Sequence, residues 1–129
     1  MFNRFLFALT FLIGVTVSAL GSAAPTGGTE PQVVNVIARR FAFEPSTITV
    51  AVGQPVRLMV RSEDGVHGME IKKFKVNKDI PRGGEAVIIN FTPATVGEFP
   101  IMCSEYCGDG HEDMRGTLVV QAQSAAPQP

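Results

Sequence analysis

Apolar and polar positions alternate along much of this chain with a period of two residues. The clearest case is the run 55–61, in which every second position is apolar: Val56, Leu58 and Val60. Successive side chains of a strand point to opposite faces, so this run predicts a strand with one buried face and one mostly wet face.

Other short segments carry the β-branched and aromatic composition of strands, and several end at glycine or proline. They are residues 33–37, 41–43, 47–52, 85–92, 99–103 and 117–121. No ten-residue window beyond residue 24 shows a helical period. Many short strands separated by glycine-containing turns predict an all-β fold, a sandwich or barrel.

The first 24 residues have the pattern of an export signal. Arg4 precedes an apolar run over residues 5–20, and the small residues Ser22 and Ala24 fit a signal-peptidase site. Residues 5–24 are also long enough to cross a bilayer as an uncleaved anchor. We therefore expect a periplasmic or exported protein, either free or anchored to the outer face of the cytoplasmic membrane.

The expected organisation is a single domain with short flanking segments, as the length of 129 residues suggests. The predicted parts are a signal peptide or signal anchor (1–24), a flexible lead-in (25–32), the domain (33–122) and a disordered tail (123–129).

Charge changes this picture little. The net charge of -1 argues against nucleic-acid binding, which needs a broad basic surface. A basic stretch does occur within residues 72–82, and we interpret it as a solvated strand edge that discourages aggregation. Its bases are Lys72, Lys73, Lys75, Lys78 and Arg82.

The densest chemistry lies within residues 103–114. This run holds both cysteines, one of the two histidines and a methionine: Cys103, Cys107, His111 and Met114. The other histidine, His67, falls in a predicted loop between two strands. If both loops lie at the same end of a sandwich, His67 can reach the distal cluster.

Three interpretations of the cluster compete. Two cysteines in an exported protein usually form a disulfide, but that leaves the histidines and Met114 without a role. A structural zinc site could use Cys103, Cys107, His111 and His67, again without Met114. Copper accepts thiolate, imidazole and thioether together, and a pair of coppers bridged by two thiolates uses every donor.

The cluster resembles the CuA domain of cytochrome c oxidase subunit II, with its pattern C-S-E-x-C-G-x-x-H-x-x-M. The matching positions are Cys103, Ser104, Glu105, Cys107, Gly108, His111 and Met114. The run 64–69 resembles the upstream D-V-x-H-[SG]-F pattern of that family, with one offset position and Met69 in place of the aromatic residue. The flanks 97–100 and 115–120 match as well, and the resemblance covers about residues 33–122.

The resemblance implies a cupredoxin Greek-key sandwich that holds two copper ions. It implies that Cys103 and Cys107 bridge both ions. His67 and Met114 would complete one copper, while His111 and the backbone carbonyl of Glu105 would complete the other. The pair would share one unpaired electron when oxidised.

The family also implies partners. The protein would be an electron-transfer module with no catalytic site of its own, taking electrons from a donor such as cytochrome c and passing them to a terminal oxidase catalytic subunit or another acceptor. In such a complex the Glu105 carboxylate would contribute to a magnesium site; otherwise it faces solvent. The chain has no tryptophan and at most one membrane segment, whereas typical subunit II has two. This favours a single-span or solitary periplasmic form. The alternative function is copper delivery or storage.

Acidic side chains lie on or near both copper loops, and these loops carry few balancing bases beyond Arg115. They are Glu63, Asp64, Glu98, Asp109, Glu112 and Asp113. They would either steer a cationic cytochrome or simply confer solubility.

Overall fold

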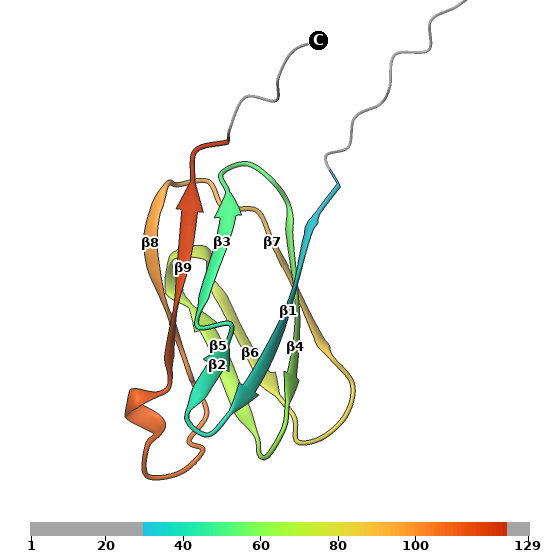
Figure 1. Cartoon of the computed structure of the whole chain (residues 1–129), viewed down its shortest axis with the longest axis vertical. Helices are drawn as coiled ribbons and strands as arrows, with labels where there is room; N and C mark the ends of the chain where they lie inside the picture. Colours follow the sequence, from blue (N-terminus) through green and yellow to red (C-terminus); the bar gives the residue numbers. More distant parts are fainter. Residues whose placement is uncertain (1–29, 124–129) are drawn as a thin grey trace, which may run out of the picture.

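Two β-sheets face each other in the computed structural model, which describes residues 30–123 (Figure 1). The first sheet has the order β2-β1-β4-β7 and the second has the order β3-β9-β8-β5-β6. The strands of the first sheet are β1 (Gln32–Arg39), β2 (Ala42–Glu44), β4 (Val56–Ser62) and β7 (Val87–Phe91). Those of the second are β3 (Thr47–Ala51), β5 (His67–Ile71), β6 (Val76–Ile80), β8 (Gly97–Met102) and β9 (Arg115–Gln121). The described residues contain no α-helix, only the 3-10 turns η1 (Lys72–Phe74) and η2 (His111–Asp113).

The directions of strand pairing in each sheet determine at which end of the sandwich each loop lies. β1 pairs with β4 in parallel, and β3 pairs with β9 in parallel, whereas the remaining pairs are antiparallel. The turn after β1, the loop after β4 and the segment after β8 therefore lie at the same end, the lower end in Figure 1. The start of β1 and the end of β9 lie at the other end.

The core fills the space between the sheets and follows the alternation seen in the sequence. In β4, Val56, Leu58 and Val60 are buried while Arg57 and Arg61 are exposed. Fully burying an aliphatic side chain of this size contributes about 1.5–3 kcal/mol. The core continues without a break to the lower end, where its last members are Met69, Ile101, Cys103, Cys107 and Met114.

All the strands predicted from the sequence are present, and the all-β expectation is confirmed. Two further strands were missed, β5 and β6. β5 is buried at four of its five positions and carries a histidine and a glycine, so it shows neither alternation nor a typical strand composition. The prediction that His67 lies in a loop is wrong, because it is the first residue of β5. β6 is polar in its middle and forms the edge of its sheet, which fits the expected solvated basic edge.

The predicted signal or anchor segment (1–24) lies outside the described residues, as does nearly all of the predicted tail. Within residues 30–123, no helix has the length and apolar character needed to cross a bilayer.

Candidate metal centre

The two predicted loops meet at the lower end of the sandwich. Cys103 directly follows β8, Cys107 lies in the turn beyond it, and His67 opens the neighbouring β5. One ligand atom from each of these three residues lies within 4.8 Å of the other two, and all three side chains are buried. The structure therefore brings His67 to the cysteines, as the sequence predicted.

His67 is oriented by a carboxylate. Its Nε2 lies 2.7 Å from Oδ1 of Asp64. An ionised carboxylate only accepts hydrogen bonds, so Nε2 donates to Asp64, and in the neutral ring the free lone pair is on Nδ1. Nδ1 has no partner, and within residues 30–123 it is the only buried side-chain nitrogen or oxygen without one. Such an atom costs about 1–3 kcal/mol when left unsatisfied, and a metal ion would satisfy it.

The two cysteines are separate thiols. Their sulfurs lie 3.8 Å apart, and the Cys103 thiol donates to the backbone carbonyl of Glu105 at 3.1 Å. Burial first, and then the neighbouring Cys103 sulfur, raises the pKa of the Cys107 thiol to about 11. Without metal this group holds its proton at neutral pH. Because a metal ligates the thiolate, metal binding must release that proton.

His111, the first residue of the 3-10 turn η2, and Met114, which directly follows that turn, both lie near Cys107. The Cys107 sulfur lies 3.8 Å from Nδ1 of His111 and 3.7 Å from Sδ of Met114. Met114 is fully buried, whereas His111 is partly exposed and packs near the ring of Tyr106. His111 lies outside the compact group formed by His67 and the two cysteines. The Cys107 sulfur therefore lies within 3.8 Å of a donor atom from each of Cys103, His111 and Met114.

Gly68 allows the two segments to approach so closely. A Cβ atom at this position would lie 2.0 Å from Oγ of Ser104 and 2.9 Å from the backbone nitrogen of Glu105. Real side chains do not tolerate such contacts, so only glycine lets β5 lie directly against the segment that carries Cys103. Ser104 is itself held by its hydroxyl, which donates to Asn77 on β6 at 2.9 Å.

Arginines contribute to this end more than the sequence suggested. Arg40 donates from Nε to the carbonyl oxygen of Cys107 at 2.7 Å, and Arg82 donates from Nε to the carbonyl oxygen of Asp64 at 3.1 Å. The metal loops themselves carry few bases beyond Arg115, and these two arginines reach them from other segments. The two arginines come from the β1–β2 turn and the segment after β6, which no local pattern connects to the metal loops.

Two of the acidic residues predicted near the metal loops do not contribute a free negative charge there. Glu98 is the second residue of β8, at the end of that strand remote from Cys103. Glu63 lies 3.7 Å from Arg39. Burial alone would raise the pKa of Asp64, but the hydrogen bond from the Arg40 N–H, followed by that with His67, holds it below its ordinary value.

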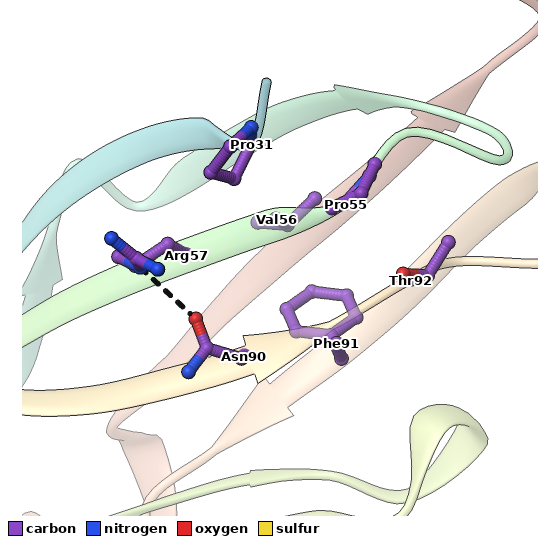
Figure 2. Close-up of a pocket in the computed structure, with 7 residues that line it drawn as sticks. All are labelled: Pro31, Pro55, Val56, Arg57, Asn90, Phe91 and Thr92. Carbon is purple, nitrogen blue, oxygen red and sulfur yellow. Dashed lines mark hydrogen bonds between the residues drawn. The ribbon is translucent and has the colours of Figure 1, made fainter. Parts of the chain in front are cut away.

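A surface pocket of about 380 Å³ lies at the opposite end of the first sheet (Figure 2). Its lining comes from the start of β1, the start of β4 and the end of β7: Pro31, Pro55, Val56, Arg57, Asn90, Phe91 and Thr92. The one hydrogen bond drawn there joins Arg57 to Asn90 at 3.2 Å. The lining contains no cysteine, histidine or carboxylate, whereas both cysteines and both histidines lie at the lower end.

Two facing sheets of this strand order, with thiol, imidazole and thioether groups at one end, define a cupredoxin. The cupredoxin-like domain model matches residues 8–120. Cytochrome c oxidase subunit 2 of Thermus thermophilus is 33% identical over 94 residues, which cover 73% of this chain and 69% of that protein. The chain belongs to the cupredoxin-like family and is homologous to the CuA domain of cytochrome c oxidase subunit II.

Solved structures agree with this assignment. A chain of a heme-copper terminal oxidase dimer superposes with a TM-score of 0.63 at 26% identity, covering 70% of this chain and 65% of that one. The periplasmic domain of subunit II of cytochrome oxidase (CoxB) of Bradyrhizobium japonicum superposes with a TM-score of 0.64. It covers 70% of this chain and 84% of that domain at 19% identity, and this second likeness concerns the fold alone.

Proposed function

We propose that this chain carries single electrons through a binuclear copper centre at the lower end of the sandwich. Family membership implies copper-mediated electron transfer. The observation that carries the finer proposal is the buried, unpartnered Nδ1 of His67, because Nε2 is committed to Asp64 and a ring nitrogen of His67 lies within 4.8 Å of both cysteine sulfurs.

In this proposal Cys103 and Cys107 would hold both coppers. His67 and Met114 would complete the ligands of one copper, while His111 and the carbonyl of Glu105 would complete those of the other. The separation of His111 from His67 supports placing the two histidines on different coppers. Met114 and His111 both flank Cys107, the Glu105 carbonyl lies beside Cys103, and His111 stands apart from the compact group that contains His67. A single tetrahedral zinc would leave Met114 unused.

A copper pair bound here would supply one-electron chemistry with little rearrangement. The protein's own contribution is to hold its ligands in place. His67 is fixed by Asp64, both cysteines and Met114 are buried in the core, and the Cys103 N–H donates to the Met114 carbonyl at 3.2 Å. Ligands that barely move between redox states favour fast electron transfer.

The same enclosure argues against copper delivery. Cys103 and Cys107 are only 7% and 6% exposed, and His67 and Met114 are fully buried. A receiving protein would have to displace ligands that belong to the hydrophobic core, so the site is suited to retaining its metal.

The partners and location follow from the proposed role. We expect a cytochrome c-like donor, a terminal oxidase catalytic subunit or other acceptor, and a position outside the cytoplasm. The Glu105 side chain is exposed, so its carboxylate is available for magnesium at a contact with a catalytic subunit.

Metal reconstitution tests the proposal. The purified domain should bind two coppers per chain, turn purple and give a mixed-valence electron-spin-resonance signal. The Cys103→Ser variant is the matched control and should lose that signal, since one thiolate cannot form a double bridge. A single loosely held copper(I), or preference for colourless zinc, would overturn the proposal.

A further inference from the structure

Within residues 30–123, Arg40 is the one residue that donates hydrogen bonds both to the Cys107 segment and to Asp64 in the segment that precedes His67. It follows β1 in the turn that leads to β2. Its side-chain Nε donates to the carbonyl oxygen of Cys107 at 2.7 Å, and its backbone N–H donates to Oδ2 of Asp64 at 2.8 Å. The other oxygen of Asp64 bonds to His67 at 2.7 Å. A continuous chain of hydrogen bonds thus runs from Cys107 through Arg40 and Asp64 to His67.

Few other hydrogen bonds tie the Cys107 segment to the rest of the sandwich, although the ring of Phe41 packs against Gly108 and Gly110. Cys103 and Met114 are joined by a backbone hydrogen bond at the base of the loop, and η2 makes its own internal bonds. Across residues 30–123, Arg40 is the only hydrogen-bond donor to the carbonyl of Cys107. A bond from a charged donor is stronger than one between neutral groups. Its loss would therefore free the middle of the loop.

The guanidinium also approaches the other loop. A Cβ atom on Gly65 would lie 3.2 Å from Nη2 of Arg40, so the side chain lies against the segment that precedes His67. Because guanidinium groups remain charged at all working pH values, a fixed positive charge stands beside the metal loops. This charge favours the state of the centre that holds one more electron, although solvent screens the effect.

We propose that Arg40 is a positioning residue: its side chain fixes the Cys107 segment against the His67 segment, and its charge raises the reduction potential of the bound centre. The positioning part concerns the protein without metal. The part about potential rests on the proposed electron-transfer function.

Arg40→Gln is the informative variant, because it removes the charge and the Nε donor but keeps the backbone bond to Asp64. Arg39→Gln is the matched control. Arg39 is the preceding residue, and its ion pairs go to Glu44 and Glu63 rather than to Asp64 or the Cys107 segment. Arg40→Lys keeps the charge but replaces the planar fork with a single ammonium.

Amide hydrogen exchange of the metal-free, reduced proteins tests positioning. In Arg40→Gln the amides of residues 104–110 should exchange about tenfold faster, the factor expected when a charge-assisted hydrogen bond is lost. Arg39→Gln should match the parent within twofold, and Arg40→Lys should fall between them. Equal exchange in Arg40→Gln and Arg39→Gln would overturn the positioning role. If Arg40→Gln fails to fold, the same comparison between Arg40→Lys and Arg39→Gln decides the question.

Redox titration of the copper-loaded proteins tests whether the Arg40 charge raises the reduction potential. The potential should fall in Arg40→Gln and stay near the parent value in Arg40→Lys and Arg39→Gln. An unchanged potential in Arg40→Gln would overturn the electrostatic part. If the parent itself forms no binuclear centre, the proposed function fails, while the exchange experiment on metal-free protein still decides the positioning role.

Discussion

The two histidines of the centre sit in regions of very different construction. His67 is fully buried at the start of a central strand, and Asp64 fixes its ring. His111 lies on a 3-10 turn outside the regular strands, partly exposed, with Tyr106 beside it. The His67 side is an extension of the core, so changes there should affect folding as well as metal. Changes on the His111 side should affect metal with little effect on folding.

Replacing each histidine by alanine should give the largest contrast. In metal-free protein His67→Ala leaves a buried cavity and removes the hydrogen-bond partner of Asp64. We therefore expect the free energy of unfolding to fall by about 2–4 kcal/mol. His111→Ala removes a partly exposed ring and should cost less than about 1 kcal/mol. Urea unfolding under reducing conditions measures both. Equal losses would show that the two regions do not differ in this way.

Gly68→Ala should cause the next-largest loss of stability, because the added methyl group forces β5 and the Cys103 segment apart. A Cβ atom 2.0 Å from Ser104 Oγ must displace the loop, at a cost of about 1–3 kcal/mol. Adding Ser104→Ala should recover part of this loss, while the contact with the Glu105 backbone keeps the recovery incomplete. The same unfolding experiment applies, and no recovery in the double variant would place the strain elsewhere.

Met114→Leu should have a smaller effect on stability. Met114 is fully buried, and leucine conserves most of its volume, so the metal-free protein should lose less than about 1.5 kcal/mol. A weak thioether ligand tunes more than it holds, so copper should stay bound and the reduction potential should shift. Metal analysis with redox titration checks this, and complete copper loss would contradict the proposed role of Met114.

Tyr106→Phe should have the smallest effect. The side chain is 73% exposed, and its hydroxyl donates only to Asp109, at 3.2 Å. The expected change in stability is within about 0.5 kcal/mol. A larger loss in thermal unfolding would mean that the His111 side is more ordered than its exposure indicates.

Most of the strands could be predicted from the sequence because their residues follow local patterns of alternation and β-branched composition. The alternation in β4 and the β-branched runs of β1 and β3 identify strands that bury one face. The sequence did not predict β5 because two of its buried positions are His67 and Gly68. These residue types suit the metal site, but they do not have the composition typical of a strand.

The candidate site was predictable to a similar degree. Cys103, Cys107, His111 and Met114 stand within one short segment, and His67 was the only other histidine in the chain. Arg40 could not be predicted to join them. It acts on a carbonyl 67 residues away, and a hydrogen bond to a backbone oxygen leaves no signature in the residue it contacts.

The pairing of β9 sets the order in which the molecule can assemble. β9 lies between β3 and β8, and it closes the loop that carries five of the six proposed ligands. The β3–β9 pairing joins residues as far apart along the chain as Thr47 and Thr117, and such contacts form late because the entropy of closing a long loop must be overcome first. Before β9 docks, the two thiols belong to an open segment that could hold metal only in a loose, exchangeable way. Specific loading must therefore wait for this last strand.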